Sequence, residues 1–278
     1  MEFGMKLHFQ ITKLAFAISL VVTGNTQVNA KETASLIEQS LPVASSKPLN
    51  EPIFAAPPLP PGTGAPGRRS EAGTRGCEMA GKPVASSQQR LFNALAPVYK
   101  SVDVNSGVDS EVVLGLTTAA RPTFWFYVPY LSPSTYGEFV LEDEAGKLSV
   151  YSVALNQIPG IIGLTLSPTA TSLEIGKRYR WYFNVYCQKD NELFRFVEGD
   201  IERLQLNPSL QNQLEQASLQ QKVRLYAANG IWYDSLTIAA ELHRKSLNDP
   251  NWATLLRTVG LSEFAQEPIV SHTTLEKK

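Results

Sequence analysis

The sequence is poor in the residue types that most catalytic centres use. Its 278 residues include only three histidines and two cysteines, and His243 and His272 lie in a predicted helix and a polar C-terminal tail. A Ser-His-Asp triad needs a histidine beside its nucleophile, and zinc sites use clustered cysteines and histidines. Neither a G-x-S-x-G motif nor such a cluster occurs in the sequence. We therefore expect a protein that is not an enzyme and that holds no metal and no cofactor.

The sequence also lacks an excess of charge and a long apolar run. Its formal net charge is −1, which provides no basic surface to hold nucleic acid or anionic lipid. The apolar run Leu14–Val22 covers nine residues, whereas a helix that spans a bilayer needs about 20, and no later run is long enough. We therefore expect no nucleic-acid partner and no membrane span after signal cleavage.

The N-terminus has the pattern of a secretory signal peptide. Lys6 and Lys13 precede the apolar run, and Val28 and Ala30 stand three positions and one position before the expected cleavage site. Cleavage after Ala30 makes residues 1–30 the signal peptide and makes the protein periplasmic or secreted. The alternatives are an uncleaved anchor and an apolar start that arose by chance.

Export gives the two cysteines a meaning. In an oxidising compartment Cys77 and Cys187 can pair, and their even number leaves no orphan thiol. A cross-link that closes a loop of about 110 residues stabilises a fold by about 4–5 kcal/mol through chain entropy. The alternative, a nucleophilic cysteine, requires a nearby base, and the sequence offers few histidines to serve as one. We therefore predict a disulfide between Cys77 and Cys187.

The segment after the signal peptide has the composition of a linker. Residues 31–76 are rich in proline and glycine, most densely at Pro57–Gly62. Such a composition cannot bury a core and favours extended polyproline conformation. We expect residues 31–76 to be a disordered linker, and recognition of its prolines by an SH3-type domain is the weaker alternative.

Residues 77–206 have the pattern of a β-sheet domain. Short runs rich in β-branched and aromatic residues, such as Pro122–Tyr130 and Gly160–Leu166, alternate with turn residues, and Gly146 can provide the positive φ of a hairpin. No helical pattern lies between these runs, which argues against βαβ units. We therefore expect an antiparallel β-sandwich that resembles immunoglobulin and fibronectin type III domains.

The segment LEIGKRYRWYFNVYC, Leu173–Cys187, is the most informative strand. Its side chains alternate between the two faces of a sheet, so the odd-numbered positions from Tyr179 to Cys187 are expected in the core and the even-numbered positions outside. The spacing of Leu173, Gly176 and Tyr179 resembles a tyrosine corner, in which a tyrosine bonds back to the preceding loop. We therefore expect this strand to dominate the core.

The last third of the chain changes to a helical period. Asn207 before a proline is a good helix start, a second helix runs through Trp232–Arg244, and Asp249 opens a third. We expect residues 207–262 to form a helical tail on or beside the sandwich, and residues 263–278 to be disordered.

Part of this helical region resembles a tetratricopeptide hairpin. The residues that match the repeat in spacing are Val223, Tyr226, Gly230 and Trp232. The resemblance fails at Ala239, where the repeat has a bulky ring, and the closing proline, Pro250, comes late. Because one repeat cannot bury its own face, the hairpin is expected to pack on the sandwich or to await another protein's helices.

Four segments together resemble a larger family. They are GRRSEAGTRGC, GLTTAARPTFWFYVPY, LEIGKRYRWYFNVYC and YAANGIWYDSLTIAAEL, which span about Gly67–Leu261. In this order they are similar to the cyanobacterial domain of unknown function 928. The resemblance implies an exported protein of cyanobacterial origin and implies no catalytic residues.

Three functional hypotheses follow, the first of which is a binding or adaptor module in the cell envelope. Trp232, Tyr233 and Asp234 stand beside Gly230 in the helical hairpin, and aromatic anchors often dominate the energy of an interface. We predict that these three residues contact an unknown protein partner. The alternative is that Trp232 only packs on the sandwich.

The second hypothesis is a β-sandwich that binds carbohydrate or peptidoglycan. Its aromatic residues are those of Pro122–Tyr130, together with Tyr136, Tyr182 and Tyr186. Exposed rings would stack on sugars, whereas buried rings would only form core.

The third hypothesis is a carboxylate-based glycoside hydrolase. Glu198, Asp200 and Glu202 alternate along a predicted strand and so share one face, where two could act as acid and base or three could hold Ca²⁺. A charged outer edge that prevents aggregation is the simpler interpretation. The carboxylates Glu142–Glu144 are most simply the solvated end of a hairpin.

Overall fold

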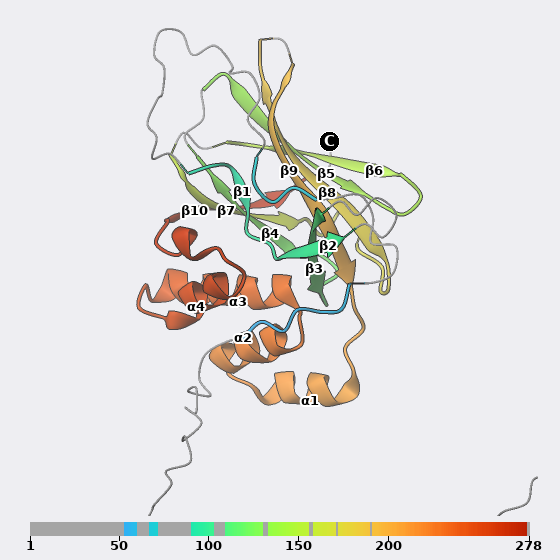
Figure 1. Cartoon of the computed structure of the whole chain (residues 1–278), viewed down its shortest axis with the longest axis vertical. Helices are drawn as coiled ribbons and strands as arrows, with labels where there is room; N and C mark the ends of the chain where they lie inside the picture. The colour runs from blue at the N-terminus through green and yellow to red at the C-terminus, as the bar shows by residue number, and fades with distance from the viewer. Residues whose placement is uncertain are drawn as a thin grey trace, which may run out of the picture. The chain divides into compact units, whose positions relative to one another are not determined.

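The computed structural model describes two sheets and a group of helices (Figure 1). It describes residues 53–59, 67–71, 90–102, 109–129, 133–155, 158–170, 172–189 and 191–276. The predicted signal peptide, residues 1–30, and Cys77 lie outside the described residues. No helix in the described part of the chain combines the length and apolar character needed to span a bilayer.

The larger sheet has six strands. Within the described residues, four of its five neighbouring strand pairs are antiparallel, and the fifth pair, β3 with β9, is parallel. The order across the sheet is β2 (Val98–Val102), β3 (Asp109–Thr117), β9 (Leu193–Arg203), β8 (Arg178–Cys187), β5 (Thr135–Glu142) and β6 (Leu148–Val153). The predicted hairpin around Gly146 is confirmed, since β5 pairs with β6 and Gly146 has a φ of 74°.

The smaller sheet has four strands and brings together distant parts of the chain. Its order is β1 (Asn93–Ala94), β4 (Thr123–Val128), β7 (Gly160–Leu166) and β10 (Ile269–Leu275). The last strand runs parallel to β7. The expectation of purely antiparallel sheets is therefore wrong at two pairings, because long connections separate the paired strands and permit parallel alignment.

The alternation predicted for β8 is confirmed. Every second side chain is buried, and Trp181 and Phe183 on the inner face are almost fully so. These two rings contact Phe126 of the smaller sheet at centroid distances of 5.6 and 4.8 Å. The two sheets therefore pack face to face through aromatic side chains, which bury large apolar areas.

The strand β4 is buried on both faces, because helices cover the face that the larger sheet does not. Trp125 points to the helices, where its Nε1 donates to the Thr237 hydroxyl at 3.1 Å and its ring lies 6.2 Å from that of Trp252. Among the helices, α3 (Trp232–Lys245) contacts both β3 and β4, and Figure 1 shows it between these strands and the remaining helical region. This explains why PTFWFYV is apolar at consecutive positions rather than at alternate ones.

Four helices occupy the helical region instead of the expected three. They are α1 (Pro208–Gln216), α2 (Leu219–Ala228), α3 (Trp232–Lys245) and α4 (Pro250–Thr258), followed by the short helix η1 (Ser262–Phe264). Asn207 and Asp249 cap α1 and α4 as expected. The additional break comes at Ser218, whose side chain forms a capping box with Gln221 at the start of α2.

The C-terminal segment differs from its expectation. We expect disorder over residues 263–278, but this range contains the end of η1 and the strand β10, which pairs with β7 over Ile269–Leu275. The helices therefore connect two strands and are not a tail. More than half of the residues of β10 are polar, and the strand is ordered by its pairing with β7. No local sequence pattern indicates this pairing.

Residues 67–71 join the two sheets, although they fall within the predicted disordered linker 31–76. Arg68 exchanges two backbone hydrogen bonds of 2.9 Å with Glu198 of β9. Two residues later, Ser70 bridges to Asn93 of β1. The linker prediction is therefore wrong for this segment, because backbone pairing orders it without requiring apolar side chains.

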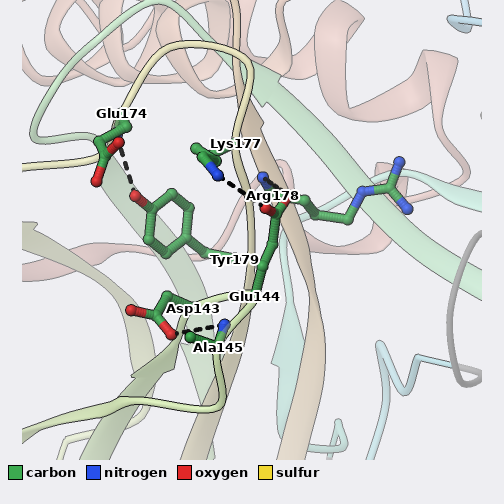
Figure 2. A network of polar contacts seen from close by, with 7 residues as sticks. All are labelled: Asp143, Glu144, Ala145, Glu174, Lys177, Arg178 and Tyr179. Atoms are coloured by element: carbon green, nitrogen blue, oxygen red, sulfur yellow. Dashed lines mark hydrogen bonds and ion pairs between the residues drawn. The ribbon is translucent and has the colours of Figure 1, made fainter.

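A hydrogen bond expected from the tyrosine-corner resemblance is present. The backbone N–H of Glu174 donates to the Tyr179 hydroxyl at 3.1 Å (Figure 2). Nearby, Glu144 accepts from the Lys177 ammonium and from the Arg178 backbone N–H, both at 3.2 Å. The loop before β8 is thus tied to its own strand and to the β5–β6 turn.

We predict that Tyr179→Phe lowers the free energy of unfolding by about 1 kcal/mol, because the Glu174 N–H loses its acceptor while the ring is retained. Urea denaturation of the two proteins measures this difference. Tyr136→Phe is the control: its hydroxyl makes an exposed bond of 3.4 Å, so removal should leave stability nearly unchanged. Equal stability of Tyr179→Phe and the wild type would contradict the role of this bond.

Candidate functional site

A pocket of about 180 Å³ lies where the helices meet the end of β3 and the start of β4. Its lining includes Arg121 from the β3–β4 loop, Tyr226 from α2, and Asp234 and Ile238 from α3. Opposite charges from separate elements therefore face one small cavity. This combination of concavity and convergent polar groups is typical of a ligand site.

Asp234 occupies the first turn of α3 and is held there by the end of β3. Its Oδ2 accepts from the Thr117 hydroxyl at 2.7 Å and the Thr118 N–H at 3.1 Å, and its Oδ1 accepts from the Thr118 hydroxyl at 2.5 Å. Burial raises the pKa of Asp234, and these hydrogen bonds oppose that effect. The helix N-terminus also favours a negative charge at this position.

Trp232 and Tyr233, the other two predicted partner-binding residues, are not available at the surface. Trp232 is fully buried, and its Nε1 donates to the Leu95 carbonyl at 2.8 Å. Tyr233 packs so closely on Gly115 that a Cβ there would lie 2.5 Å from its Cε2. Neither ring is therefore exposed to a partner in this structure, and Trp232 packs on the sheets as the alternative interpretation had it.

The surface of the helical hairpin is occupied by the chain itself. Phe54 meets Trp232 edge to face at 5.2 Å, and the Ala55 N–H donates to the Ala227 carbonyl at 3.0 Å. Gly230, at φ 71°, leaves room for this segment, since a Cβ would lie 2.8 Å from the Ala55 oxygen. Residues 53–59 are therefore ordered against α2 and α3, which corrects the linker prediction a second time.

The outer face of the six-stranded sheet carries a row of half-buried tyrosines. Tyr136 of β5 and Tyr186 of β8 stand opposite each other, and their rings stack at 5.2 Å with an interplanar angle of 17°. Asn184 donates to the Tyr186 hydroxyl at 3.3 Å, and the Tyr182 hydroxyl donates to Glu142 at 3.0 Å. Burial raises the pKa of Tyr182 and of Tyr186.

The rings of β4 belong to the core instead. Phe124, Trp125, Phe126 and Tyr127 are at most a few per cent exposed. Of the aromatic residues considered for sugar binding, the structure therefore places those of β4 inside and Tyr136, Tyr182 and Tyr186 on a surface.

The three alternating carboxylates of β9 share the outer face, as predicted, and each faces an arginine of β8. Arg180 lies 2.8 Å from Glu198 and 3.8 Å from Asp200, and Arg178 lies 3.4 Å from Glu202. Burial raises the pKa of Asp200, and both arginines oppose that effect. The arrangement is a cross-strand ion-pair ladder, which stabilises a sheet surface.

Cys187 takes the inner position predicted for it and is 8% exposed. Its predicted partner, Cys77, lies outside the described residues, so the disulfide stays a prediction.

The two histidines considered as possible catalytic bases, His243 and His272, make different packing contacts. His243 of α3 stacks on Trp252 at 5.8 Å, and burial lowers its pKa. His272 of β10 places its Nε2 2.7 Å from the Thr165 hydroxyl, and burial, with Arg244 nearby, lowers its pKa as well. The folded state therefore favours the neutral form of both rings.

Sequence reasoning did not single out Arg121 and Tyr226 as pocket residues. Arg121 stands in a short loop and Tyr226 on a helix that begins almost a hundred residues later, so no local pattern connects them. Asp234 was selected, but for its neighbours in sequence and not for this cavity.

The chain matches one family model, described as Domain of Unknown Function (DUF928), over residues 70–269. This range covers most of the chain, so the protein belongs to that family. No match was found among the curated proteins or among the solved structures.

We predict that the free energy of unfolding falls when the pH is lowered from 7.5 to 5.5. An ordinary histidine, as in the unfolded chain, has a pKa of about 6.5, and the pKa of the His243 and His272 rings is lower in the folded chain. Above a pH of about 6.5 the rings are neutral in both states and stability is intact. Below that pH the unfolded chain takes up protons that the folded chain does not, so the free energy of unfolding falls. Urea denaturation across this range measures the effect. The fall should be smaller in His243→Gln, and an identical pH dependence would exclude His243 as a source.

Proposed function

We propose that this member of the DUF928 family is a non-catalytic binding module of the cell envelope, and that its sheet surface binds carbohydrate such as peptidoglycan. The observation that carries the proposal is the stacked pair Tyr136 and Tyr186 on the outer face of the larger sheet. Both rings are half-buried, so their hydrophobic surface is partly accessible while their positions are held by the strands.

The surroundings of the tyrosine pair suit a sugar. The C–H face of a pyranose packs against an aromatic ring, and its hydroxyls need donors and acceptors at the edge of that ring. In the next cross-strand row, Glu138 stands opposite Asn184, which already bonds to the Tyr186 hydroxyl. Tyr182 and Glu142 continue the polar strip along the same face. The strip therefore offers aromatic and hydrogen-bonding groups side by side.

Two observations favour this surface over the other hypotheses. The helical hairpin, considered for a protein partner, has Phe54 against Trp232, so any partner there would have to displace the chain's own segment. The carboxylates considered for glycoside hydrolysis are paired with Arg178 and Arg180. A catalytic pair needs one carboxyl to give a proton and the other to stay accessible to substrate or water, and ion pairing supports neither role.

The finer features of the proposal rest on the sequence and on one hydrogen bond of the structure. The N-terminal pattern supports export to the periplasm or beyond, with signal cleavage after Ala30 and a disulfide between Cys77 and Cys187. The Tyr179 hydrogen bond supports the resemblance of the sheets to immunoglobulin and fibronectin type III sandwiches, and the residue spacing of the α2–α3 hairpin supports its resemblance to a tetratricopeptide unit. We also propose the cyanobacterial origin that the four family segments imply.

We expect the protein to cosediment with purified peptidoglycan and Tyr186→Ala to weaken this binding about tenfold, because a stacked aromatic contact contributes about 0.5–1.5 kcal/mol beyond burial. Tyr186→Phe is the matched control, since it keeps the ring and should retain most of the binding. A glycan array extends the test to other polysaccharides. Absence of retention on every glycan, or full binding by Tyr186→Ala, would contradict the proposal.

Export has its own test. Protein recovered from outside the cytoplasm should begin at Lys31, and its thiols should react with an alkylating agent only after reduction, as intact-mass spectrometry can show. Cys187→Ser should lower the free energy of unfolding by about 4–5 kcal/mol through loss of the cross-link. Two reactive thiols in the unreduced exported protein would refute the disulfide.

A further inference from the structure

The pocket beside α3 is a second site, independent of the tyrosine surface. Asp234 and Arg121 both line it, yet among the described residues no ion pair joins them. The two charged side chains face one cavity and do not bond to each other, so both can bind a ligand that lies between them.

Within the described part of the chain, Arg121 uses few of its hydrogen-bond donors. Its side chain is exposed, and its hydrogen bond within the described part of the chain is a long one, from Nη2 to the Ala170 carbonyl at 3.4 Å. A guanidinium carries five N–H donors in a planar fork that fits a carboxylate in a bidentate manner. The arginine is thus equipped to bind an anionic group at the pocket.

Asp234 supplies the complementary charge. Thr117 and Thr118 donate two hydrogen bonds to its Oδ2 and one to its Oδ1, and its own backbone N–H is a further donor to the carboxylate. A carboxylate offers about four acceptor positions, and an ammonium group in the pocket would share them through a strong charge-assisted hydrogen bond. A cation bound there would also offset the desolvation that raises the pKa of Asp234.

The size and walls of the pocket limit the ligand. Its volume of about 180 Å³ is below the range of about 300–1,000 Å³ usual for drug-sized ligands. Pro122, Ile238 and the ring of Tyr226 provide apolar lining. The hydroxyl of Thr237, also in the lining, accepts from Trp125 and so is fixed in place. A small molecule with an apolar part fits these walls.

We propose that this pocket binds a small zwitterion, namely a free amino acid with a short apolar side chain. Its ammonium group would contact Asp234, its carboxylate would contact Arg121, and its side chain would lie against Ile238 and Tyr226. Recognition would require both charged ends, because each pocket charge left without a partner loses a charge-assisted hydrogen bond.

Isothermal titration with alanine, valine and leucine, each as both enantiomers, tests the proposal on the full exported chain. At least one free amino acid should bind, and its N-acetyl and C-amide derivatives should each bind at least tenfold more weakly. If no free amino acid binds, or if the blocked derivatives bind equally well, the proposal is wrong.

Variants locate the site. Arg121→Gln, at an exposed loop position, should weaken the free amino acid at least tenfold, whereas Arg257→Gln on the exposed side of α4 should leave its affinity unchanged. Ile238→Phe, which fills the pocket without removing a charge, should abolish binding. Unchanged affinity in Arg121→Gln and Ile238→Phe would place the amino acid elsewhere. Peptidoglycan cosedimentation should be the same in all three variants, so the two proposals can fail separately.

Discussion

The aromatic contact between β8 and β4 is the constraint on which the rest of the structure depends. Trp181 and Phe183 from one sheet and Phe124 and Phe126 from the other interlock edge to face, with Phe139 completing the group. Such pairs add directional preference to apolar burial, and a shift of β8 by one residue would turn its whole inner face to solvent. The register of β8 therefore decides at once which side chains form core and which form a surface.

Both candidate sites are consequences of that arrangement. Because the odd positions of β8 point inward, Tyr182, Asn184 and Tyr186 must point outward, where they meet β5 and β9 in register. Because β4 gives one face to β8, its other face is left for the helices, and Trp125 binds α3 and α4 there. The pocket of Asp234 lies at the end of this second interface, so the sheet contact positions the tyrosine surface and the pocket on different layers.

Features that depend on neighbouring residues could be predicted from the sequence, and features that depend on distant residues could not. The alternation of β8, the turn at Gly146 and the caps Asn207 and Asp249 depend on neighbours in sequence, and all were predictable. The strand β10, the docking of Phe54 on Trp232 and the approach of Arg121 to Asp234's pocket depend on partners far along the chain, which one sequence does not pair. Trp232 illustrates the ambiguity, because the same adjacent aromatic residues in a sequence are typical both of a binding anchor and of a core. The structure distinguishes the two, since it buries the ring.

The central claim is that the outward face of β5 and β8 binds carbohydrate while the inward face holds the sheets together. Titration of the isotopically labelled protein with soluble peptidoglycan fragments, followed by two-dimensional NMR, addresses it directly. The claim predicts that the shifted signals cluster on Tyr136, Tyr182, Asn184 and Tyr186 and their strand neighbours, with the inner rings unaffected. Shifts centred on the helices, or no shifts at saturating fragment concentration, would contradict it.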